Sequence, residues 1–272
     1  MKHWFDPARL RKLRQKQEVT FTPLFLHRPL AILFLIPTAD IPWMTPNRIT
    51  LVSVVMRMVV AVLLWPAEWG GPVLSTAELW GVILLWHFGT VLDAVDGALA
   101  RYRGLSSVFG RMIDKVSDRI VTLCLFLPLA ARAWLETHDP HMFLLAMTYL
   151  TTSGAASLSK WISLGLETQL QGTAEKVKDD YENEAPSRTP GEWARYLLKG
   201  LAAAVIFTEM DLPLWGSIAL LTGRTDLLFW AFGVAGSAYA LAVVVRRTFM
   251  LYRAERTLAA SRAKSSTALS NP

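Results

Sequence analysis

Long apolar runs separated by short polar connections dominate this sequence, and they constrain its fold more than any other feature. A helix that crosses the hydrocarbon core of a bilayer needs about 20 predominantly apolar residues. Hydrophobic residues make up 53% of the 272-residue chain and charged residues only 18%, against roughly 25% charged in soluble domains. We therefore predict an all-α integral membrane protein with six transmembrane helices.

The spans can be placed from the apolar runs, with Thr45 and Pro46 marking a helix start ahead of the first. The fifth is the hardest to place, because Glu209 and Asp211 lie in its apolar stretch. If this span begins near Leu197, both acids lie in mid-membrane. If residues 197–207 form an interfacial helix, the acids lie at the cytoplasmic end, which the cost of buried charge favours. The predicted spans cover residues 47–65, 76–101, 107–131, 142–166, a fifth run ending near residue 223, and 227–249.

The rest of the chain divides around this six-helix domain, which covers residues 45–253. Residues 1–44 are predicted to be a cytoplasmic, interfacial segment that opens with a basic amphipathic helix suited to an anionic leaflet. A polar insert at 167–195 separates the fourth and fifth spans. The tail at 254–272, rich in Ser, Ala and Thr, is predicted to be disordered.

Lysine and arginine predict the orientation of the chain. They gather beside the N-terminus, around Arg101 and Arg103, in the insert and after the sixth span, whereas the connections on the other side carry only Arg224. By the positive-inside rule both termini are cytoplasmic, in the inner or plasma membrane of the cell. Because the basic residues flank apolar runs instead of forming one stripe, nucleic-acid binding is excluded. A single cysteine, Cys124, excludes an internal disulfide.

Four aspartates lie near the facing ends of the second and third spans. Positions i, i+3, i+4 and i+7 share one face of a helix, and a short connection makes the two helices antiparallel neighbours. Each carboxylate inside a membrane costs a few kcal/mol, and four together repel one another. Divalent cations with oxygen ligands, such as Mg²⁺ or Mn²⁺, remove both costs. The predicted metal-binding residues are Asp93, Asp96, Asp114 and Asp118.

Small residues and one arginine accompany these carboxylates. Gly97, Ala100 and Gly110 leave room for a nucleotide to approach the backbone, and Arg101 offers a planar fork for phosphate. Two metal ions can stabilise the attacking and leaving oxygens of a displacement at phosphorus. The residues alone therefore favour metal-dependent phosphoryl chemistry.

The whole pattern, D-x2-D-G-x2-A-R-x8-G-x3-D-x3-D from Asp93 to Asp118, resembles the signature of the CDP-alcohol phosphotransferase family. The resemblance implies that Asp93, Asp96 and Asp114 ligate two metal ions, and that Asp118 touches one of them and acts as general base on the acceptor hydroxyl. It also implies attack on the β-phosphorus of a CDP-linked donor, release of CMP, and a homodimer. The implied CDP site is lined by Gly97, Ala100, Arg101 and Gly110, with Asn47 and Thr50 nearby.

Within this family, CDP-diacylglycerol or its ether analogue is the favoured donor, with transfer of an aminoalcohol from CDP-choline or CDP-ethanolamine to a lipid as the alternative. Phosphatidylinositol-phosphate synthases, a branch of the family, bind the acceptor phosphate with a lysine of the fourth span. Lys160 resembles it, and Arg246 and Arg247 resemble a basic residue of the same pocket. These three predict a small phosphorylated acceptor such as inositol phosphate or glycerol phosphate. A snorkelling lysine and ordinary positive-inside arginines are the alternatives.

Two other classes of function remain to be compared with this enzyme. A cation transporter also carries intramembrane carboxylates, but it has no need of a nucleotide cradle. A non-catalytic family member would not need all four aspartates. His87 is interpreted as a packed polar residue, and Lys115 and Arg119 as residues that neutralise local charge or meet a dimer partner.

Overall fold

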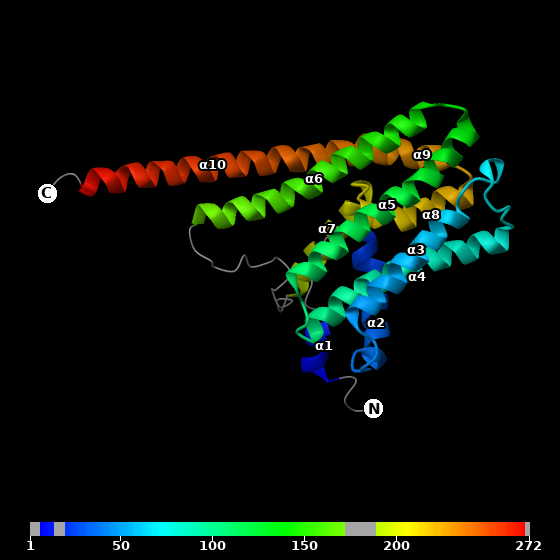
Figure 1. Cartoon of the computed structure of the whole chain (residues 1–272), viewed down its shortest axis with the longest axis horizontal. Coiled ribbons are helices and arrows are strands. Elements are labelled where there is room, and N and C mark those ends of the chain that lie inside the picture. Colours follow the sequence, from blue (N-terminus) through cyan, green and yellow to red (C-terminus); the bar gives the residue numbers. More distant parts are fainter. Residues whose placement is uncertain (1–5, 14–19, 172–188, 270–272) are drawn as a thin grey trace.

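The computed structural model describes residues 6–13, 20–171 and 189–269, and this part of the chain is helical without any strand (Figure 1). The described residues form ten α-helices, together with several 3-10 and π-helical turns. The helices are α1 (Pro7–Leu13), α2 (Arg28–Thr38), α3 (Pro46–Leu63), α4 (Thr76–Tyr102), α5 (Val108–Thr137), α6 (His141–Gln171), α7 (Pro190–Ala202), α8 (Leu212–Thr222), α9 (Thr225–Trp230) and α10 (Ser237–Leu269).

Four helices of the described chain are long and apolar enough to cross a membrane: α3, α4, α5, and the continuous run from α9 into α10. The pair α7 and α8 makes a fifth candidate, bent by 88° at its break. The helix α6 is 31 residues long, but Ser and Thr in its second half lower its hydropathy. The structure thus supports four or five spans by length and composition, and the predicted count of six is not confirmed.

Residues at the helix starts explain several boundaries. Pro46 occupies the first turn of α3, where backbone N–H groups have no intrahelical partner, so the N–H that proline lacks costs no hydrogen bond. Ser75 and Glu78 form a reciprocal capping box at the start of α4, and Ser107 accepts a bond from the Gly110 N–H at the start of α5. The helix α7 begins with the same box, built from Thr189 and Glu192. The predicted insert at 167–195 lies for the most part outside the described residues.

Two apolar clusters hold the helices together. The larger joins α3, α4, α5, α6, α8 and α9, and includes the buried rings of Trp86 and Phe126. There α8 packs tightly on α4, because a Cβ at Gly216 would lie 2.6 Å from the Trp86 ring. The smaller cluster packs α1 and α2 against α3 and α4.

The N-terminal helix differs from the sequence-based expectation. Arg9 was expected on a lipid leaflet, but it is only 4% exposed and donates to Asp40 Oδ2 (2.8 Å) and to the Tyr102 hydroxyl (3.2 Å). Leu13 is 3% exposed and belongs to the smaller apolar cluster. The described part of this segment is therefore tied to α2 and α4, and an interfacial helix is not confirmed.

The connections segregate to two ends of the molecule. In Figure 1 the α3–α4, α5–α6 and α8–α9 connections lie at the right, whereas the α4–α5 turn and the C-terminal ends of α6 and α10 lie towards the left. The tail is a correction: α10 continues as a helix to Leu269, where disorder was predicted from residue 254. Ala, Leu, Arg and Lys make up most of the last part of this helix, and all four are strong helix formers.

Candidate active site

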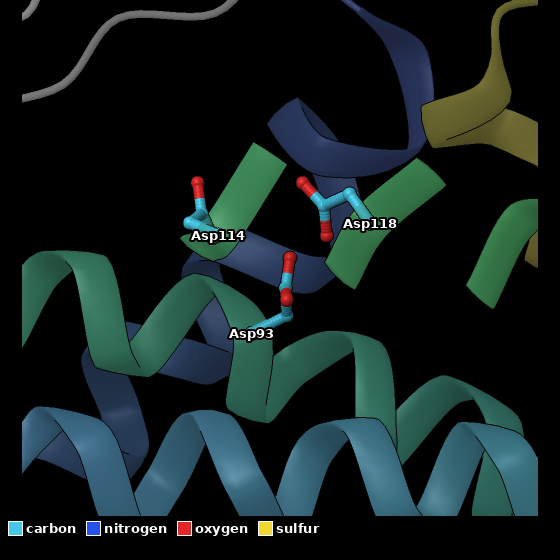
Figure 2. Close-up of side chains that lie close together, drawn as sticks. All are labelled: Asp93, Asp114 and Asp118. Atoms are coloured by element: carbon cyan, nitrogen blue, oxygen red, sulfur yellow. The ribbon is translucent and has the colours of Figure 1, made fainter. Parts of the chain in front are cut away.

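The antiparallel pair of α4 and α5 brings three of the four predicted carboxylates together. One carboxylate oxygen each from Asp93, Asp114 and Asp118 lies within 4.8 Å of the others. Figure 2 shows the three side chains converging, Asp93 from α4 and the other two from successive turns of α5. Their partial exposure leaves the group open to a ligand.

The fourth aspartate is held apart from this group. Asp96 is 5% exposed, and its Oδ2 accepts a bond from the Thr50 hydroxyl on α3. Thr50 also lies against the Pro46 carbonyl, 3.0 Å away. The bond to Thr50 explains why Asp96 lies outside the group of three, although it shares the inward face of α4.

Two cations lie among the carboxylates. The guanidinium of Arg57, from the middle of α3, is 2.6 Å from Asp93 Oδ1 and 3.5 Å from Asp118 Oδ1. Lys115 Nζ lies 2.9 Å from Asp114 Oδ2 and 3.1 Å from Asp118 Oδ2. Gly89 makes room for the stem of Arg57, since a Cβ there would be 3.0 Å from Arg57 Cγ.

The charge balance of this group fits a divalent ion. Four aspartates lie near the two cations Arg57 and Lys115 in a setting of apolar helices, so among the described residues the carboxylates outnumber the cations that form ion pairs with them. Carboxylate oxygens are the ligands that Mg²⁺ and Mn²⁺ favour, and Mg²⁺ completes its shell with substrate phosphates. Asp93, Asp114 and Asp118 have the donor set and the spacing for such an ion.

A cavity of about 290 Å³ opens beside Asp118. Its walls come from α5, α6, α10 and the break between α7 and α8, and four of its side chains are basic. They are Lys115, Arg119, Lys160 and Arg247. Arg247 Nη1 donates to the Ala156 carbonyl (2.5 Å) and to Ser159 Oγ (3.1 Å), which holds it against α6.

The predicted acceptor residues separate in the structure. Lys160 and Arg247 line the cavity together, whereas Arg246 is exposed and is not among its lining residues. The side chains of successive helical residues point about 100° apart, so only one of the two arginines can face α6.

The predicted nucleotide residues line the neighbouring part of α3, α4 and α5. Asn47 is exposed in the first turn of α3. Arg101 folds back over Gly97, because a Cβ at Gly97 would lie 3.3 Å from Arg101 Nη1. Gly110 donates its N–H to Ser107 Oγ and so forms part of the cap of α5. Ala100 is half-buried one turn beyond Asp96.

Sequence reasoning missed Arg57 and the environment of Arg119. An arginine within an apolar span is costly, and Thr50, Ser53 and Arg57 have the spacing of one helix face, so Arg57 could have been found from the sequence. Arg119 is 3.2 Å from Glu209 Oε2 and donates to Ser153, which agrees with the expectation that it neutralises a local charge. His87 is packed as expected, between His27 and Ser217.

Apolar helices that hold converging carboxylates next to a basic cavity are typical of membrane enzymes that act on phosphate groups. Residues 43–171 match the family model of CDP-alcohol phosphatidyltransferase, so the chain carries a domain of this family. The match contains α3, α4, α5 and α6 and therefore all four aspartates.

Three curated relatives are described as phosphatidylinositol phosphate synthases. The protein of Mycobacteroides abscessus is 33% identical over 97 residues, covering 34% of this chain and 40% of the relative. The protein of Corynebacterium glutamicum is 36% identical over 82 residues, covering 30% and 33%. That of Mycolicibacterium smegmatis is 26% identical over 117 residues, covering 43% and 49%. The chain thus matches less than half the length of each relative.

Proposed function

We propose that this protein transfers a phosphatidyl group from CDP-diacylglycerol, or a similar CDP-linked lipid, to a hydroxyl of a small phosphorylated polyol and releases CMP. The observation that carries the proposal is the position of Asp118. It belongs to the carboxylate group on one side and lines the basic cavity on the other. One carboxylate therefore touches both the place for a metal-bound diphosphate and the place for an acceptor.

The chemistry follows from this position. Asp118 accepts the proton of the acceptor hydroxyl, the acceptor oxygen forms a bond to the β-phosphorus of the donor, and the bond from that phosphorus to CMP breaks. Arg57 and Lys115 lie 3.5 Å and 3.1 Å from the two carboxylate oxygens of Asp118 and so orient this side chain, and a general base must be held within reach of the proton it takes. Divalent ions, Mg²⁺ or Mn²⁺ and two in number by analogy with the family, would neutralise the donor phosphates when bound.

The residues on the donor side are proposed from the motif and their location. Asp93, Asp96 and Asp114 would hold the ions with Asp118. Gly97, Ala100, Arg101 and Gly110 would line the CDP site, with Asn47 and Thr50 beside it. The bond from Thr50 to Asp96 supports this grouping, because it joins the start of α3 to the aspartate of α4.

The acceptor is proposed from the charge of the cavity. Four basic side chains face only two carboxylates, Asp118 and Glu209. This excess of positive charge favours a phosphomonoester and disfavours a cationic aminoalcohol. Inositol phosphate is the first choice, and the printed names of the three relatives support it. Lys160 and Arg247 would bind its phosphate, and Arg246 has a minor part at most.

The wider setting belongs to the same proposal. Six membrane crossings, counting α6 and the broken pair of α7 and α8, would leave both termini and the active site at the cytoplasmic face of the cell membrane. The homodimer implied by the family is also proposed. A cation transporter is disfavoured, because an ion path has no need of a basic cavity beside its carboxylates.

The test is a screen of acceptors with purified protein and radiolabelled CDP-diacylglycerol. We expect labelled lipid and CMP in equal amounts, with inositol phosphate or glycerol phosphate preferred over serine, choline and ethanolamine. No release of CMP with any acceptor, or release with aminoalcohols alone, would contradict the proposal.

A further inference from the structure

The break in the bent pair of α7 and α8 forms one wall of the basic cavity. Phe207 stands at this break with φ +53°, a left-handed conformation that costs a residue with a Cβ about 1–3 kcal/mol. Its carbonyl oxygen lies against Gly236, where a Cβ would be only 2.9 Å away. Its ring packs on Trp215 and Phe232. The surrounding helices therefore fix the backbone that follows, Thr208 to Asp211.

Two acids follow Phe207, and their surroundings differ. Asp211 is fully buried and accepts the Thr22 N–H and the Thr208 hydroxyl, both at 2.7 Å. Those bonds connect the break to the start of the helical turn that precedes α2, so Asp211 has a structural role. Glu209 keeps 33% of its side chain exposed and lines the cavity. Glu209 is exposed to the cavity and follows a backbone conformation that costs free energy, so a structural role does not explain its position.

Glu209 is held in place by Arg119. The guanidinium of Arg119 donates to Ser153 Oγ (3.0 Å) and to the Ser153 carbonyl (3.3 Å), and it lies 3.2 Å from Glu209 Oε2. An ionised carboxylate has about four lone-pair sites, so one ion pair does not exhaust its capacity. The carboxylate is thus a fixed acceptor on a wall that also contains Asp118.

The chemistry of the cavity decides what Glu209 can bind. A cationic group would face Lys115, Arg119, Lys160 and Arg247, so the bound molecule is an anion. A neutral hydroxyl can donate to Glu209 without disturbing its pair with Arg119. A volume of about 290 Å³ lies at the small end of ligand sites, which suits a molecule the size of a sugar phosphate.

We propose that Glu209 is a specificity-determining residue of the acceptor cavity: its carboxylate accepts hydrogen bonds from hydroxyls of the polyol that do not react. This inference rests on the proposed function and adds to it the reason why a polyol is chosen over a simple alcohol phosphate. An acceptor without those hydroxyls cannot donate to the remaining lone pairs of the carboxylate, and hydrogen-bonding sites reject analogues in this way.

The test compares two acceptors of equal charge, inositol phosphate and 3-hydroxypropyl phosphate, with CDP-diacylglycerol as donor and the full chain in lipid nanodiscs. For Glu209→Gln we expect kcat/KM for inositol phosphate to fall about 10- to 100-fold, through a higher acceptor KM at constant donor KM. The value for 3-hydroxypropyl phosphate should change less than about threefold. Glu209→Asp should recover part of the preference, and the exposed Glu255→Gln on α10 should match the wild type.

Other outcomes separate the two proposals. An equal loss with both acceptors, accompanied by a lower melting temperature, would make Glu209 only the counter-ion of Arg119 and overturn this inference, while the proposed function stands. Unchanged preference in Glu209→Gln would overturn it as well. If the wild type transfers to neither phosphate, or only to an aminoalcohol, the proposed function fails and this inference with it.

Discussion

The two halves of the candidate site are built in different ways. The carboxylate half comes from neighbouring turns of α4 and α5, within the signature from Asp93 to Asp118. The cavity half takes Arg119 from α5, Lys160 from α6, Glu209 from the break and Arg247 from α10. Chemistry shared by a family can be fixed by helical spacing, whereas the proposed acceptor cavity is assembled from positions far apart in the sequence.

The largest expected effect concerns the carboxylate half as a whole. Removal of divalent ions with a chelator should abolish transfer, because the aspartates would then repel the donor diphosphate. Mg²⁺ or Mn²⁺ should restore it, measured as release of CMP. Full activity in the presence of chelator would show that the carboxylates serve another purpose.

Asp118→Asn is the sharpest single substitution in this half. The amide cannot take a proton from the acceptor, so kcat should fall by about 10³-fold or more, with the melting temperature little changed. The matched control is Asp139→Asn in the α5–α6 connection, at the opposite end of the molecule. Wild-type turnover in Asp118→Asn would refute its role as base.

The cavity half should respond through binding and not through turnover. Lys160→Ala and Arg247→Gln should each raise the acceptor KM about 10-fold or more and leave the donor KM unchanged. Arg246→Gln, on the exposed neighbour, should change it much less. Equal effects of Arg246→Gln and Arg247→Gln on the acceptor KM would show that the positive charge of these residues matters and that their position relative to the cavity does not.

The last prediction concerns the stability of the carboxylate half and has no direct effect on the acceptor cavity. Arg57→Met removes a buried cation from beside two carboxylates, which typically costs about 3–5 kcal/mol. The loss of melting temperature should be greatest with chelator and should shrink when Mg²⁺ is added, because the ion replaces the lost charge. Arg48→Met, at the exposed start of α3, is the control. The same loss with and without Mg²⁺ would separate Arg57 from the metal site.

Much of the carboxylate half could be predicted from the sequence, because helical spacing is local. The starts of α3, α4 and α5 and the grouping of Asp93, Asp114 and Asp118 follow from it, whereas α5 runs six residues beyond its predicted end at 131. The bond from Thr50 that sets Asp96 apart could not be predicted, since it depends on how α3 packs against α4. The burial of Arg9 has the same origin: its partners Asp40 and Tyr102 are distant in the chain.

The cavity half was less predictable for a related reason. The ion pair between Arg119 and Glu209 could not be predicted from the sequence, because no local residue pattern shows that α5 contacts the break after α7. Of the two positions considered for Glu209 and Asp211, the sequence favoured the cytoplasmic end of the fifth span over mid-membrane, and the 88° bend of the pair agrees with that preference. It could not show that one acid would face the cavity and the other the protein interior.

If Glu209 selects the acceptor as proposed, the bond from the Thr22 N–H to Asp211 connects the amino-terminal stretch to that selection. A deletion or an affinity tag that disturbs the chain around Thr22 would leave Asp211 without its main-chain donor, two residues from Glu209. Enzyme engineered in that way could keep its reaction and lose its discrimination, so tags are better attached beyond the end of α10.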